Sequence, residues 1–352
     1  MTRLDLEPRY IAGLVGLVGL GVAPFVLDVL TLRQLTAAMF LGMFAMSWDY
    51  VSGYTGQLSF GHSMFFGIGG YTAAVLNLQL DVSPVIAILV GTIFAGVVGF
   101  ALGFPALRLR GPYLALITLI APLVLMQIVN IFPGVLGGDA GLPSPDDVLS
   151  DGIVETIGTT LAPLGFESPF EQEVLVYYYL TLLLFLGIYA LFFVFTRSYV
   201  GTIFTAIHED EDAVLSAGIN AAKFKIFAFT MSGAVGGFAG AAFVHVPVGD
   251  PLPSEILALT LSIEVVIISI VGGMGTITGP AIAGIGYYFV RDALQTSDVG
   301  IPILGTTVGH VSMVLFFLLA LLVLFFLPKG VVPWATEWSR DVLESRESPT
   351  PS

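Results

Sequence analysis

The stretch PVIAILVGTIFAGVVGFALGFP, residues 84–105, decides the fold class, because it carries no charged side chain over a length that can cross a lipid bilayer. One crossing by an α-helix needs about twenty predominantly apolar residues. The rest of the chain has the same character, since 56% of its 352 residues are hydrophobic and only 11% are charged. No water-soluble core of this size needs so much apolar surface. The sequence therefore predicts a polytopic membrane protein.

Apolar runs of similar length recur on both sides of this stretch, and they predict an all-α fold of about ten transmembrane helices. The runs lie at residues 10–30, 34–52, 58–79, 84–105, 112–133, 174–196, 226–246, 256–274, 278–296 and 308–328. They divide the chain into an N-terminal segment with the first span (1–33), a transmembrane domain (34–328) and a tail predicted to be disordered (329–352).

The basic residues predict the orientation, because lysine and arginine accumulate in cytoplasmic loops. With both termini in the cytoplasm and ten crossings, only Arg33 and Arg291 fall near the outer face. The other basic residues all fall in the cytoplasm: Arg3, Arg9, Arg108, Arg110, Arg197, Lys223, Lys225, Lys329, Arg340 and Arg346. Loop 197–225 is then cytoplasmic and loop 134–173 is external.

The external loop 134–173 is acidic throughout. It contains no lysine or arginine, and its acids are Asp139, Asp146, Asp147, Asp151, Glu155, Glu167, Glu171 and Glu173. Such a loop is either a docking rim for an external partner or a solvated connection, and charge alone favours the second reading.

Loop 197–225 is the polar segment on the cytoplasmic side between two long apolar runs, and its centre reads AIHEDEDAVLSAGIN. Four acids suit a helix N-terminus, and a glycine follows where a left-handed C-terminal cap is expected. The segment therefore predicts a short cytoplasmic helix that a soluble protein could bind. Its contact residues are predicted to be Glu209, Asp210, Glu211, Asp212, Ala213, Val214 and Gly218.

Two glycine-rich tracts, residues 52–76 and 271–289, lie at junctions between predicted spans. Each glycine lowers helix stability by roughly 1 kcal/mol relative to alanine, so the tracts indicate either a broken helix along a pathway or close helix packing. Both tracts contain Gly-Ile-Gly, at residues 67–69 and 284–286. This match indicates either an internal repeat around a central binding site or a chance similarity.

Ionisable side chains within spans are functional candidates, because their insertion costs about 2.5 to 3.5 kcal/mol. Asp49, His62 and Glu264 lie within predicted spans, whereas Arg291 and Asp292 are expected at the membrane surface. Together with the glycine tracts they predict a translocation pathway. Its residues are Asp49, Gly53, Gly56, Gln57, His62, Glu264, Gly272, Gly273 and Gly275.

Several kinds of chemistry have no support in the sequence. It contains no cysteine, and its four histidines show no metal-ligand spacing, so no metal site is expected. It has no GxxxxGK[ST] phosphate-binding loop, so ATP hydrolysis would need other subunits. The net charge of −14 suits a salt-adapted prokaryote, and no nucleic-acid partner is expected.

Five blocks of the sequence, taken together, resemble the inner-membrane permeases of branched-chain amino acid ABC importers, the LivM type. They are GYTGQLSFGHSMFFGIGGYTAAVL, GPYLALITL, GGDAGLPS, AIHEDEDAVLSAGINAAKFKIFAFTMSGAVGGFAGA and SIEVVIISIVGGMGTITGP. The resemblance covers residues 35–328. It implies a non-catalytic permease that carries leucine, isoleucine and valine through the plasma membrane by alternating access.

The resemblance also implies partners. These are a second permease of the LivH type, two ATPase subunits that bind ATP and Mg, and an external solute-binding protein. The family's coupling loop has a pattern of EAA followed by glycine four positions later. Asp212, Ala213, Val214 and Gly218 match it with two substitutions, and the later proline is missing.

Three alternatives stay open. A urea or short-amide permease of the same family would share the architecture. An ion-coupled secondary transporter would use Asp49 and Glu264 as ion or proton sites. A membrane-embedded enzyme is the weakest alternative, because no nucleophile, base and metal constellation is present.

Overall fold

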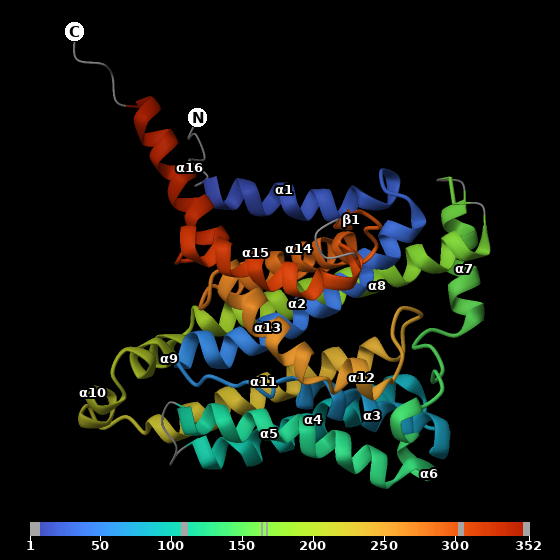
Figure 1. The fold of residues 1–352 in the computed structure, drawn as a ribbon, viewed down its shortest axis with the longest axis horizontal. Coiled ribbons are helices and arrows are strands. Elements are labelled where there is room, and N and C mark those ends of the chain that lie inside the picture. The colour runs from blue at the N-terminus through green and yellow to red at the C-terminus, as the bar shows by residue number, and fades with distance from the viewer. Residues whose placement is uncertain (1–7, 107–111, 163–164, 167, 302–305, 348–352) are drawn as a thin grey trace.

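The structure is a computed structural model that describes residues 8–106, 112–162, 165–166, 168–301 and 306–347 (Figure 1). Its first half contains α1 (Pro8–Val22), η1 (Ala23–Phe25), α2 (Val29–Thr55), α3 (Ser63–Leu80), α4 (Pro84–Ala106), α5 (Pro112–Ile131), α6 (Pro133–Leu136), η2 (Gly138–Ala140) and α7 (Asp151–Leu161). Its second half contains α8 (Pro169–Thr196), α9 (Tyr199–Glu209), α10 (Glu211–Ser216), α11 (Ala221–Phe243), α12 (Pro253–Ile256), α13 (Leu259–Gly272), α14 (Thr278–Gln295), β1 (Gly300–Ile301), β2 (Thr306–Thr307), η4 (Gly309–Val311), α15 (Ser312–Phe326) and α16 (Val331–Glu347).

The predicted fold class, an all-α polytopic membrane protein, is confirmed. Within the described residues, seven helical segments are long and apolar enough to cross a membrane, judged by length and composition: Val29–Thr55, Pro84–Phe104, Tyr113–Ile131, Pro169–Thr196, Ala221–Phe243, Pro253–Gly272 and Gly309–Ser339. Helices α1, α3 and α14 lie in three further apolar runs that the sequence predicted as spans. Each of them is shorter or less apolar than these seven segments. The count of ten spans stays a prediction.

Local sequence signals explain where several helices begin and end. At the start of α2 the Asp28 side chain accepts a hydrogen bond from the Thr31 amide, and α8 begins with a capping box formed by Ser168 and Glu171. Helix α2 ends at Gly56, whose φ of 70° is the left-handed conformation that glycine adopts without strain.

Helix α2 forms the centre of the bundle and packs against α8, α11, α13 and α14. Its side chains Phe44, Trp48 and Tyr50 are fully buried, and the Trp48 indole donates to the Ser59 carbonyl at 2.6 Å. A buried indole that keeps its hydrogen bond fixes the position of the connection between α2 and α3.

Close backbone contacts, permitted by glycine, hold the remaining helices together. A side chain at Gly69 of α3 would collide with the backbone of Gly237 in α11, and one at Gly284 of α14 would collide with Gly42 in α2. Small residues at helix contacts let backbones approach closely inside a membrane. Both Gly-Ile-Gly segments therefore serve helix packing, and the internal repeat stays a prediction.

The bundle has two distinct ends (Figure 1). Helices α9 and α10, the start of α11 and helix α16 lie at one end, which we call the α10 end. Helix α7 and the segment before it lie at the opposite end, which we call the α7 end. Loop 134–173, for which the sequence predicted no internal structure, contains most of α6 as well as η2 and α7.

The tail is a correction to the sequence prediction, because residues 331–347 form helix α16 instead of a disordered segment. Two interactions support this helix. The rings of Trp334 and Trp338, one turn apart, stack with centroids at 6.4 Å, and Lys329 pairs with Glu337 at 2.8 Å. Residues 348–352 lie outside the described residues, as do Arg3, Arg108, Arg110 and Glu167 of the topology argument.

Candidate functional site

The polar segment at the α10 end forms the predicted short helix. Helix α10 begins at Asp210, whose carboxylate accepts a hydrogen bond from the Ala213 amide at 3.0 Å. The acids Glu211 and Asp212 occupy the first turn, where the positive end of the helix dipole favours negative charge.

Gly218 ends α10 in the left-handed conformation, with a φ of 80°, as the sequence predicts. The Gly218 amide donates a hydrogen bond to the Leu215 carbonyl, and the Ile219 amide donates one to the Val214 carbonyl. This pair of hydrogen bonds is the Schellman motif. Apart from its two chain neighbours, no described residue has a heavy atom within 4 Å of where a Gly218 Cβ would stand. The glycine is therefore required by the backbone conformation and not by crowding.

The two apolar side chains of α10 face opposite ways. Val214 is buried against Ile203 and Ile207 of α9 and Ala221 of α11. Leu215 is 48% exposed. Val214 was predicted to contact a partner, but its burial makes it an anchor of α10 on the bundle. Leu215 is the exposed apolar residue, and the sequence pattern alone did not single it out.

An ion pair also ties α10 to α11. The Lys225 ammonium lies 2.5 Å from the Glu211 carboxylate, and the lysine side chain is only 2% exposed. A buried ammonium costs several kcal/mol unless it is paired. Glu211, predicted as a contact for a partner protein, thus has a second role as the internal partner of Lys225. Glu209, Asp210 and Asp212 remain on the exposed side.

Asp49 lies inside the bundle and holds the connection between α13 and α14. Its carboxylate accepts hydrogen bonds from the amides of Gly275 at 2.7 Å and Ile277 at 3.1 Å. Gly275 and Ile277 both have positive φ, of 77° and 56°, and Gly53 of α2 packs directly against Gly275. These bonds stabilise a backbone conformation that is costly for Ile277.

His62 occupies a separate buried cluster at the start of α3. Its Nε2 lies 3.1 Å from the Ser47 hydroxyl and 3.2 Å from the Ser232 hydroxyl, and its ring packs against Phe44 and Phe65. Within the described residues its Nδ1 has no hydrogen-bond partner. The cluster joins α2, α3 and α11 and is apart from Asp49.

The remaining predicted pathway residues lie near the α10 end. Gly56 faces the ring of His208 in α9, and the Gln57 carbonyl accepts from Ser52. Gly272 packs on the backbone of Gly279, and Gly273 packs on Pro333 of α16. Of the nine predicted pathway residues, Glu264 is the one found among the described residues that line the two cavities beside α13.

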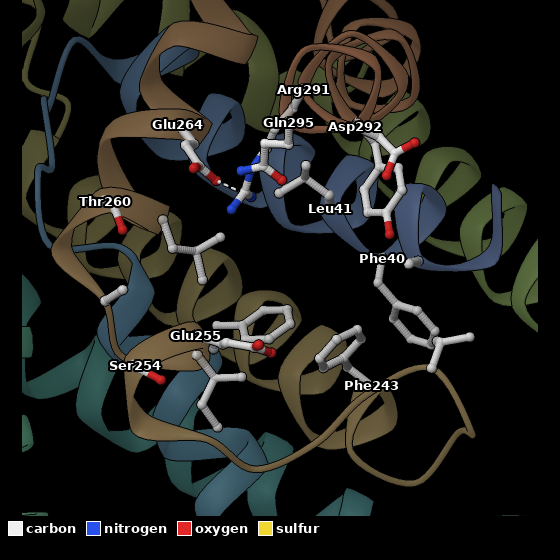
Figure 2. A pocket seen from close by; sticks show the side chains of 17 residues that line it. Phe40, Leu41, Phe243, Ser254, Glu255, Thr260, Glu264, Arg291, Asp292 and Gln295 are labelled. Carbon is white, nitrogen blue, oxygen red and sulfur yellow. Dashed lines mark hydrogen bonds and ion pairs between the residues drawn. The ribbon is translucent and has the colours of Figure 1, made fainter. Parts of the chain in front are cut away.

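Glu264 lines a cavity of about 410 Å³ (Figure 2). Helix α12, which contributes to the lining, lies on the side of the bundle nearer α7 than α10 (Figure 1). Helices α2, α3, α11, α12, α13 and α14 contribute to the lining of this cavity. Its polar lining consists of Ser254, Glu255, Thr260, Glu264, Tyr288, Arg291, Asp292 and Gln295. Its apolar lining includes Phe40, Leu41, Phe66, Phe243, Val248 and Ile256. A smaller cavity of about 190 Å³ adjoins it and shares Thr260, Glu264, Arg291 and Gln295.

Charged groups of both signs meet at this cavity. Figure 2 shows Glu264 and Arg291 joined at one side, with Glu255 of α12 across from them. The Arg291 guanidinium lies 3.2 Å from the Glu264 carboxylate, and Gln34 donates to Asp292 at 3.0 Å. Arg291 was predicted to lie at the membrane surface, and in the structure it lines this cavity. The sequence feature that could have indicated its pairing with Glu264 is their opposite charge on consecutive helices joined by a glycine-containing turn.

Comparison with known proteins agrees with this architecture. The family model described as branched-chain amino acid transport system, permease component, matches residues 30–326. The chain is 29% identical over 332 residues to the high-affinity branched-chain amino acid transport system permease protein LivM of Escherichia coli K12, covering 91% of this chain and 74% of the relative. It is 28% identical over 315 residues to the LivM protein of Salmonella typhimurium LT2, covering 87% and 69%. No solved structure matches.

Proposed function

Since this chain belongs to the family of branched-chain amino acid transport permease components, we propose that it is the membrane-spanning subunit of an ATP-driven importer for leucine, isoleucine and valine. The substrate is the one named for its LivM relatives. The subunit itself catalyses no reaction. A second permease, two ATPase subunits carrying ATP and Mg, and an external solute-binding protein complete the importer.

The observation that carries the proposal is that α10 is anchored on the bundle and at the same time exposes an apolar side chain. Val214 and the Lys225–Glu211 pair fix α10 to α9 and α11, while Leu215 stays exposed beside acidic residues. A short helix that presents an apolar side chain can seat in a groove of a partner protein. Because α10 is anchored on the bundle, force applied to it would move α9 and α11 with it.

The mechanism we propose is alternating access. ATP-driven closure of the two ATPase subunits would move the α10 helices of both permeases together and rock the permeases against each other. The polar residues around Glu264 would then face the path of the solute. The basic residues at the α10 end support its cytoplasmic position, and the acidic segment at the α7 end supports an external one.

The test is reconstitution of the complex in proteoliposomes, with uptake of radiolabelled leucine measured with and without ATP inside. We expect uptake only with ATP, the ATPase subunits and the binding protein. The variant Leu215→Glu should reduce co-purification of the ATPases at least about tenfold, because a charge would replace the apolar contact. The exposed variant Ser216→Glu, one residue away, is the control for added charge.

Two alternatives predict different results in this assay. A urea or short-amide permease would import acetamide and not leucine. An ion-coupled transporter would import solute through this chain alone, driven by an ion gradient. The backbone hydrogen bonds accepted by Asp49 favour a structural role for that carboxylate over an ion site.

A further inference from the structure

The cavity beside Glu264 has the size and lining of a small-molecule site. Its volume of about 410 Å³ falls within the range of roughly 300 to 1,000 Å³ that is typical of ligand pockets. Its lining comes from six helices, so a rearrangement of these helices would change its shape. Helix α12, part of this lining, lies nearer the α7 end, where the proposed function places the entry of solute.

Arg291 can bind an anionic group in this cavity. Among the described residues that line the cavity it is the one cation, and its side chain is 44% exposed. Its hydrogen bond to the Glu264 carboxylate engages one nitrogen, Nη1, at 3.2 Å. A guanidinium has five N–H donors in a planar fork, so donors remain for a carboxylate.

Glu255 can bind a cationic group on the other side of the cavity. Its carboxylate is exposed, and within the described part of the chain no hydrogen bond or ion pair engages it. Glu264 and Asp292, by contrast, already interact with Arg291 and Gln34. Figure 2 shows Glu255 reaching in from α12 across the cavity from Arg291.

An apolar wall completes the cavity. Phe40, Phe66, Phe243 and Ile256 line it beside the charged groups, and Figure 2 shows Phe40 and Phe243 away from the Glu264–Arg291 pair. These side chains offer a surface for an aliphatic group, whose transfer from water to an apolar surface is favourable. The site thus combines a guanidinium with further N–H donors, a carboxylate that no hydrogen bond or ion pair of the described residues engages, and an apolar surface.

We propose that this cavity is a transit site for a zwitterionic aliphatic amino acid within the permease. Arg291 receives the carboxylate, Glu255 receives the ammonium, and the aromatic wall receives the branched side chain. The inference rests on the proposed function and names the residues of this chain that bind the solute. A neutral amide or urea would leave the Glu255 carboxylate without an ionic partner and would bring no anionic group to the further donors of Arg291, so the cavity favours a zwitterion.

The test is saturation-transfer difference NMR of L-leucine with the reconstituted complex lacking the binding protein, a method suited to weak ligands. We expect a signal from the leucine methyl groups in the wild type. Loss of a charge-assisted hydrogen bond weakens binding about tenfold or more, so Arg291→Gln and Glu255→Gln should lose most of the signal. Arg291→Lys should retain part of it, and Glu155→Gln on exposed α7 should retain all of it.

Leucine analogues separate binding from folding defects. Leucinamide lacks the carboxylate and 4-methylpentanoate lacks the ammonium, so neither should compete in the wild type. The direct signal of leucinamide, weak in the wild type, should not fall further in Arg291→Gln, and that of 4-methylpentanoate should not fall further in Glu255→Gln. Arg291→Gln leaves the Glu264 carboxylate without its ion-pair partner. The double variant Arg291→Gln/Glu264→Gln removes this charge as well, and it should give the same signals as Arg291→Gln.

The outcomes for site and function are distinct. If the wild-type complex imports leucine with ATP but all variants keep the wild-type signal, or leucinamide competes in the wild type, the site is overturned while the function stands. If the wild type imports no leucine under any condition, the function is overturned first, and the site falls with it.

Discussion

At the residue scale, Gly218 connects a backbone conformation to the proposed coupling. Its φ of 80° costs an ordinary residue about 1 to 2 kcal/mol, and a β-branched residue more. Helix α10 has six residues and depends on its cap and its packing. A loss of this size at the cap is therefore enough to displace the helix end.

We predict that Gly218→Val abolishes solute-stimulated ATPase activity of the reconstituted complex while membrane insertion is retained. Gly218→Asn should keep most of the activity, because asparagine adopts the left-handed conformation more readily than valine. Gly152→Val in α7 is the control, since its Cβ would also meet open space but its φ is ordinary. Wild-type stimulation in Gly218→Val would contradict the coupling assignment.

Asp147, near the α7 end, makes the stability of the folded protein depend on pH. Burial raises the pKa of its carboxyl from 3.8 to about 6, with further contributions from the charges of Glu173, Asp151 and Asp146. Between these two pH values the folded protein holds a proton that the unfolded chain has released. The contribution of Asp147 to the free energy of unfolding therefore falls as pH rises from 3.8 to about 6.

We predict that Asp147→Asn raises the melting temperature in detergent at pH 7 but not at pH 4, with a stability gain of about 1 to 2 kcal/mol after solvent screening. The quantity to measure is the difference in melting temperature between variant and wild type at each pH. Burial lowers the pKa of His245, so the contribution of His245 to the free energy of unfolding rises with pH, and this difference removes it. A difference that is constant across pH would contradict the assignment to Asp147.

At the element scale, the Lys225–Glu211 pair determines whether α10 stays attached to the bundle. The pair joins the first turn of α10 to α11, and its lysine is buried. Removing one partner of a buried pair costs about 3 to 5 kcal/mol, because the other charge stays buried and unpaired. The exposed pair Lys329–Glu337 offers a matched comparison, since such pairs contribute about 0 to 1 kcal/mol.

We predict that Glu211→Gln lowers both the melting temperature and solute-stimulated ATPase activity, whereas Glu337→Gln changes neither. The double variant Glu211→Gln/Lys225→Met should recover most of the melting temperature, because no unpaired charge remains. If the double variant also recovers ATPase stimulation, Glu211 acts mainly by positioning α10. If stimulation stays low at normal stability, Glu211 touches the ATPase itself.

The same helix shows how far sequence reasoning reaches. The acids at its start and the left-handed Gly218 were predictable, because capping depends on residues three to five positions apart. The burial of Val214, the exposure of Leu215 and the pairing of Lys225 depend on how α9, α10 and α11 pack, which no local pattern encodes. Likewise Asp49 was visible as an intramembrane acid, but its partners Gly275 and Ile277 lie more than 200 positions away.

At the scale of the whole molecule, the two ends of the bundle must lie on opposite sides of the membrane for the proposed function to hold. Helix α10 and helix α7 lie at opposite ends in Figure 1. An ATPase acting on α10 requires the α10 end to be cytoplasmic, and a binding protein requires the α7 end to be external. The chain contains no cysteine, so single-cysteine variants can report the side directly.

We predict that Ser216→Cys in α10 reacts with a membrane-impermeant maleimide only in inverted vesicles, and that Thr156→Cys in α7 reacts only in intact cells. Both side chains are exposed in the structure. Ser232→Cys, at a fully buried position, should react in neither preparation and controls for leakage of the reagent. Labelling of Ser216→Cys in intact cells would place α10 outside, beyond the reach of any ATP-hydrolysing partner in the cytoplasm.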